Sequence, residues 1–82
     1  MVTASVQAFP NPTTGELNVQ FQMEPGNGYR VILLDGMGRA VNEWFTGDQV
    51  TLNVDISDVA PGLYFIQVTN GLDQEIIRIV KD

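Results

Sequence analysis

The sequence contains neither cysteine nor histidine. Without cysteine the chain forms no disulfide and offers no thiolate ligand, and without histidine it lacks the usual acid–base residue near neutral pH. These absences remove most catalytic mechanisms and most transition-metal sites, so we expect no enzyme and no cofactor. They do not identify the compartment, because a disulfide-free domain is compatible with the cytosol, a periplasm or a cell surface.

Basic residues are scarce as well, with four Lys and Arg against ten Asp and Glu and a formal charge of −6. That charge opposes binding to phosphate backbones and to anionic lipid. No apolar run approaches the roughly 20 residues of a membrane span, and the first nine residues lack the pattern of a signal peptide. We therefore expect no nucleic-acid partner and no membrane insertion. Because Met1 opens directly onto strand-like sequence, we expect the chain to be the end of a larger protein.

What the chain does have is alternation with a period of two, and no helical period. Seven such runs, separated by turn-forming residues, predict seven strands in one domain over residues 1–82. The fold class that follows is an all-β, seven-stranded antiparallel immunoglobulin-like β-sandwich, joined mostly by tight hairpins and expected to be a monomer. The predicted strands are residues 2–9, 16–22, 29–34, 40–46, 49–55, 63–68 and 74–81.

Two of these runs are apolar on both faces, which is typical of central strands covered on both sides. They are residues 29–34 and 63–68. Residues 2–9 carry small apolar side chains and are expected at an edge. Residues 70–71, Asn-Gly, predict a two-residue hairpin because both tolerate positive φ.

The stretch from Asp55 to Tyr64 combines a cap, a stop and the start of a strand. Asp55 or Ser57 can cap a short helical turn that would point Ile56 and Val59 into the core. Pro61 ends that turn, and Pro61-Gly62 predicts a type II turn with positive φ at the glycine. Tyr64 is expected to face inward, with its hydroxyl bonding back to a nearby corner.

Two loops have both a structural and a recognition interpretation. Pro10-Asn11-Pro12 predicts a rigid corner that cannot continue a strand ladder, and a rigid exposed loop is also a preorganised epitope. Residues 35–39 predict a hairpin with two positive-φ glycines and an exposed ion pair between Asp35 and Arg39, or a contact for a partner.

The last predicted strand carries Arg78 and Lys81, half of the basic residues in the chain. We expect them to protect an exposed sheet edge or to contact a partner, rather than to lie in the core.

Three further features favour structural interpretations. Asp48, Asp55, Asp58 and Asp73 match no calcium loop and are better explained as turn and cap residues. Ser5 and Ser57 have no histidine to activate them. Trp44 could form a sugar-stacking platform, but in a small sandwich it more often anchors the core.

Several short motifs occur in a recognisable order, and together they resemble one known family. It is the type A C-terminal sorting domain of the type IX secretion system of Bacteroidetes, and the resemblance runs from about Phe9 to Lys81. The family often ends with two closely spaced lysines, whereas here only Arg78 and Lys81 stand in the last strand. The motif residues are Pro10, Asn11, Pro12, Gly15, Asp35, Gly38, Arg39, Pro61, Gly62, Tyr64, Arg78 and Lys81.

The resemblance implies a non-catalytic signal that directs an N-terminal passenger protein across the outer membrane. An outer-membrane shuttle would recognise the domain, and a sortase-like peptidase would remove it. The domain would be in the periplasm in transit, and then at the cell surface or secreted. The alternative is a carbohydrate-binding or adhesive β-sandwich module appended to a secreted enzyme, which would need an exposed aromatic platform.

Overall fold

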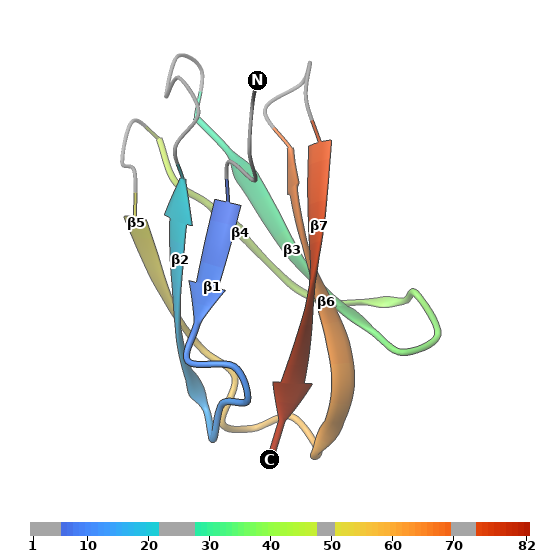
Figure 1. The fold of residues 1–82 in the computed structure, drawn as a ribbon. Helices are drawn as coiled ribbons and strands as arrows, with labels where there is room; N and C mark the ends of the chain where they lie inside the picture. The colour runs from blue at the N-terminus through green and yellow to red at the C-terminus, as the bar shows by residue number, and fades with distance from the viewer. Residues whose placement is uncertain (1–5, 22–27, 48–50, 70–73) are drawn as a thin grey trace, which may run out of the picture.

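A computed structural model of the chain describes residues 6–21, 28–47, 51–69 and 74–82 (Figure 1). Every described element is a strand, and all strand pairs are antiparallel, which confirms the predicted fold class. The strands are β1 (Val6–Phe9), β2 (Glu16–Phe21), β3 (Arg30–Asp35), β4 (Ala40–Phe45), β5 (Thr51–Asp55), β6 (Gly62–Thr69) and β7 (Gln74–Lys81).

The strands form two packed sheets, one with the order β1-β2-β5 and the other with the order β4-β3-β6-β7. As predicted, β3 and β6 are central and β1 lies at an edge. The expectation that most connections are hairpins was wrong: only β1–β2, β3–β4 and β6–β7 are neighbours in a sheet, and the other three connections cross between sheets. The strand β4 pairs with β3, whereas in a constant-type immunoglobulin domain the fourth strand joins the other sheet.

The core lies between the sheets and consists of the inward halves of the alternating patterns. In β2, Leu17, Val19 and Phe21 are buried, as the alternation predicts. The rings of Phe21 and Tyr29 stack with their centroids 4.7 Å apart, which links β2 to the residue before β3. The other buried apolar residues are Val6, Val31, Leu33, Val54, Ile56, Tyr64, Ile66, Val68 and Ile79.

The outer face of the four-stranded sheet differs from expectation. Because β3 and β6 are apolar on both faces, we expected both faces to be covered. In the described part of the chain nothing packs over the outer face, where Leu63 of β6 is 42% exposed and Ile76 of β7 is 55% exposed. Phe65 of β6 is half-buried there, between its neighbours on β3 and β7.

The carboxyl end of β7 lies at the same end of the sandwich as the β1–β2 and β5–β6 connections, and the β3–β4 hairpin projects to one side (Figure 1). The asparagine–glycine hairpin and the residues before Val6 lie outside the described residues. Within the described part of the chain, no helical segment has the length and hydrophobicity to cross a bilayer.

Candidate functional site

The segment after β1 runs along the edge of β7 and bonds to its main chain. The side-chain amide of Asn11 donates to the carbonyl of Arg78, and its carbonyl oxygen accepts the N–H of Val80, both at 3.0 Å. One asparagine thus occupies a donor and an acceptor that an edge strand otherwise leaves open. The rigid-corner interpretation of Pro10-Asn11-Pro12 is supported, and the corner also guards a sheet edge.

Thr13 continues this contact, although sequence reasoning did not select it. Its N–H donates to the carbonyl of Val80 at 2.9 Å, and its carbonyl accepts the N–H of Asp82 at 2.8 Å, which makes a parallel bridge to Lys81. Its hydroxyl donates to the carbonyl of Glu16, and the residue is only 1% exposed. We call Asn11 and Thr13, with the end of β7 that they bind, the β7 clasp.

Gly15 lies directly against the turn that follows β5. Its carbonyl accepts the N–H of Ile56 at 2.7 Å, and a Cβ added at Gly15 would lie 2.8 Å from the Cβ of Ser57. No side chain fits at that separation without movement of the turn. Glycine is therefore required here by the close approach of two segments.

The residues after β5 form the single short turn that the sequence predicts, with the N–H of Val59 donating to the carbonyl of Ile56. The predicted cap is present, because the Asp55 carboxylate accepts the N–H of Ser57 at 2.9 Å. Hydrogen bonds from the hydroxyl and the N–H of Ser57 hold the pKa of Asp55 below its ordinary value. Ile56 is buried and Val59 packs against the core, as predicted.

The expectation that Lys81 stays at the surface was wrong. The residue is only 7% exposed, and its Nζ donates to the carbonyl of Val59 at 3.1 Å. In the register of β7, Lys81 lies on the same face as Ile79, which turns inward, so its stem packs inside while the ammonium group reaches a carbonyl of the turn. Lys81 thus binds the β5–β6 connection to the last strand.

Tyr64 and the residues before it complete this corner. The tyrosine is buried and its hydroxyl donates to the carbonyl of Ala60 at 2.6 Å, which confirms the predicted bond back to the corner. The predicted type II turn at Pro61-Gly62 does not form, since Gly62 has a φ of 153° instead of about 80° and already belongs to β6, opposite Lys81.

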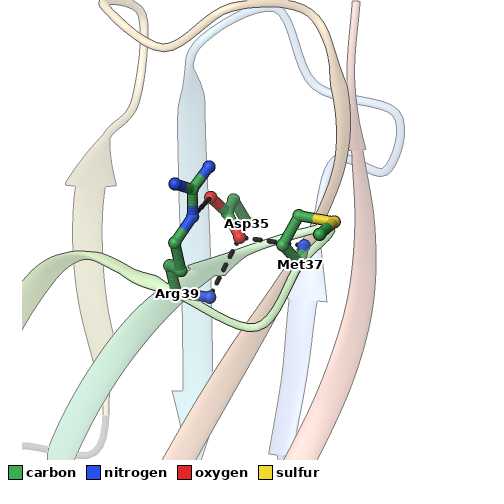
Figure 2. Close-up of polar contacts among 3 residues, drawn as sticks. All are labelled: Asp35, Met37 and Arg39. Atoms are coloured by element: carbon green, nitrogen blue, oxygen red, sulfur yellow. Dashed lines mark hydrogen bonds and ion pairs between the residues drawn. The ribbon is translucent and has the colours of Figure 1, made fainter.

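The β3–β4 hairpin is the second group of motif residues. The Asp35 carboxylate accepts the N–H groups of Met37 and Arg39, each at 2.9 Å, and pairs with Nε of Arg39 at 3.1 Å (Figure 2). The main chain adds a bond from the N–H of Gly38 to the carbonyl of Asp35 and one from the N–H of Asp35 to the carbonyl of Arg39. The predicted ion pair is present, but of the two glycines only Gly38, at 87°, has a positive φ.

Hydrogen bonds fix the backbone of this hairpin, whereas some of its side chains are exposed to solvent. Backbone hydrogen bonds from residues 39 and 37, together with the guanidinium group of Arg39, hold the pKa of the Asp35 carboxyl below its ordinary value of 3.8. Met37 at the tip is 83% exposed. The Arg39 side chain is 80% exposed, although its Nε pairs with the carboxylate (Figure 2).

The structure thus sorts the side chains of the predicted motif residues into three places. The Arg78 side chain is the one among them on the outer face of β7, where it lies opposite Phe65. The hairpin holds Asp35, Gly38 and Arg39. The corner around the end of β7 brings together Pro10, Asn11, Pro12, Gly15, Pro61, Gly62, Tyr64 and Lys81.

The other residues considered as possible glycan, metal or catalytic sites do not form such sites in the described part of the chain. Trp44 is half-buried and packs against the core, so its ring does not form the exposed platform that a glycan site would need. Asp48 and Asp73 lie outside the described residues, and no three acidic side chains gather as a metal site in the ranges that the structure covers. Ser57 donates its N–H to the Asp55 carboxylate in the turn after β5.

The chain is similar over nearly its whole length to one family of known proteins. No curated protein matches the chain. A family model described as the secretion system C-terminal sorting domain matches residues 7–82, which include all but the first residue of the seven strands. The chain therefore belongs to the family of C-terminal sorting domains of the type IX secretion system.

Proposed function

We propose that the folded sandwich is an export signal that an outer-membrane shuttle of the type IX system recognises, and that a sortase-like peptidase then removes. The observation that carries this proposal is the family match over residues 7–82, because it covers the whole two-sheet unit and not a short peptide. The signal is accordingly a folded shape. A passenger protein would precede it in the native chain.

The geometry supports two different roles for the motif residues: some stabilise the fold, and others are exposed for contact with a partner. The corner residues hold the end of β7 through hydrogen bonds that are satisfied within the domain. The hairpin differs, since the side chains of Met37 and Arg39 are largely exposed on a backbone that hydrogen bonds hold in place. A fixed loop loses little conformational entropy on binding, so the hairpin is the better candidate for direct contact.

The domain would be in the periplasm during transit and afterwards at the cell surface or in the medium. It would need no catalytic group of its own. The domain's contribution is recognition, and the chemistry of removal belongs to the peptidase.

The test is a passenger protein followed by residues 1–82, expressed in a host with a working type IX system and in a strain that lacks it. Cell fractionation measures the share of passenger at the surface and in the medium. We expect export only when both the domain and the secretion system are present. Equal distribution of the passenger with and without the domain would overturn the proposal.

A further inference from the structure

The outer face of the four-stranded sheet is unusually apolar for a surface of a small acidic domain. On the central strands, Ile32, Leu34 and Phe65 are half-buried, and Leu63 is 42% exposed. On β7, Ile76 is 55% exposed. The strand registers place these residues together, with Leu34 opposite Phe65, Gln67 between Ile32 and Ile76, and Leu63 opposite Val80. We call these six apolar residues the outer patch: Ile32, Leu34, Leu63, Phe65, Ile76 and Val80.

The charges on this face are uneven. Arg30 of β3 pairs with Glu43 of β4, and Arg39 pairs with Asp35 at the hairpin. Lys81 is turned inward to a carbonyl. Arg78 is exposed beside Phe65, and it has no carboxylate partner among the residues that the structure describes. The outer patch therefore has a guanidinium group at its margin for which the described residues supply no opposite charge.

This combination matches the core of a protein–protein interface. Such cores are depleted in Lys, Glu and Asp and enriched in aromatic residues, Met and Arg, and exposed apolar patches of this kind mark interaction sites. A second copy is a poor occupant, because each chain has a formal charge of −6, and Glu43, the acidic residue that the registers of the described strands place on this face, already pairs with Arg30. Charge complementarity instead requires a carboxylate from a different protein.

We propose that the outer patch docks a component of the secretion machinery through an apolar surface that carries a carboxylate opposite Arg78. This inference rests on the proposed export function and adds to the β3–β4 hairpin a second surface through which that function acts. Burial of the outer patch against the partner supplies the binding free energy. The pairing of Arg78 with the carboxylate fixes the orientation.

The experiment uses the passenger fusion described above with Ile76→Ser or Arg78→Gln in the domain. The matched control is Gln20→Glu, which makes the same change of one charge unit as Arg78→Gln but lies exposed on the outer face of β2, in the other sheet. Circular dichroism melting of each domain shows that the fold is kept. We expect the exported fraction to fall at least about fivefold for both outer-patch variants, as for hot-spot residues, and to stay unchanged for Gln20→Glu.

The outcomes separate the two proposals. If the unchanged domain directs export and the folded outer-patch variants export equally well, the docking surface is wrong and the export function stands. If the unchanged domain directs no export, the export function is wrong and the docking surface falls with it. Sedimentation of the unchanged domain over a range of concentrations adds a third outcome: a dimer that Ile76→Ser abolishes would assign the outer patch to self-association and overturn the partner proposed here.

Discussion

At the scale of single residues, Asn11 is the clearest case of a side chain that completes a sheet edge. Its amide and carbonyl bond to groups 67 and 69 positions away in the sequence. We expect Asn11→Ala to lower the free energy of unfolding by about 1–3 kcal/mol, since two hydrogen bonds of about 0.5–1.5 kcal/mol each are lost. Urea unfolding followed by tryptophan fluorescence measures it.

The control for this substitution is Asn53→Ala, which removes an exposed asparagine from β5. Its free energy of unfolding is expected to change by less than about 0.5 kcal/mol. If the two variants lose the same stability, the contacts of Asn11 with β7 do not stabilise the fold.

Gly15 lies too close to Ser57 for a side chain to fit without movement. Gly15→Ala places a Cβ 2.8 Å from that of Ser57, so we expect a loss of about 1–3 kcal/mol, as for other overpacked sites. Because Ser57→Gly removes the Cβ of Ser57, the double variant Gly15→Ala/Ser57→Gly should recover part of the lost free energy of unfolding. Strictly additive effects of the two substitutions on the unfolding free energy would show that this contact is not the cause.

At the scale of one element, the β3–β4 hairpin depends on an ionised Asp35. Because the pKa of Asp35 lies below 3.8 in the folded chain, its contribution to hairpin stability is complete above the unfolded pKa and is lost as the pH falls through the folded pKa. Carboxyl-carbon NMR of Asp35 should therefore titrate with a midpoint below 3.8, and the amide resonances of Met37 and Arg39 should shift with it.

The variant Arg39→Ala separates the causes of this pKa shift. The backbone N–H of residue 39 makes the largest contribution and is kept in the variant. We expect the midpoint to rise but to stay below 3.8. A return to the ordinary value would mean that the guanidinium group, and not the backbone, lowers the pKa.

The strands and turns show how far local sequence determines structure. Alternation identified all seven strands, and in β2 it identified the inward residues, because side chains of a strand point to alternate faces whatever its neighbours are. The Tyr64 hydroxyl bond was also predictable, since it joins residues four positions apart. The ion pair of Asp35 and Arg39 has the same spacing.

Contacts between distant segments were not predictable. The sequence around Lys81 predicts a charged side chain at the surface. The carbonyl that accepts a hydrogen bond from its ammonium group belongs to Val59, 22 residues away. Nothing in the sequence distinguishes the buried Thr13 from the exposed Thr14 beside it. The exposed outer face of β3 and β6 was missed for a related reason, because an apolar strand face covered by the same domain and one left for a partner have the same sequence pattern.

Across the whole molecule, the residues that hold the fold together are distinct from those whose side chains are exposed. Eight of the twelve motif residues gather at the corner around the end of β7, and in that corner Asn11, Tyr64 and Lys81 direct their polar side chains to main-chain groups of the domain. Their loss should impair export only through unfolding. Loss of a residue that contacts the partner should impair export of a folded domain.

The most direct test of this separation is the exported fraction of a passenger that carries Asn11→Ala, measured at a temperature where circular dichroism shows the variant domain to be folded. The account predicts export close to that of the unchanged domain there, and loss of export only as the temperature approaches the melting transition of the variant. A folded Asn11→Ala domain that fails to direct export would contradict it, because Asn11 would then be read by the secretion machinery itself.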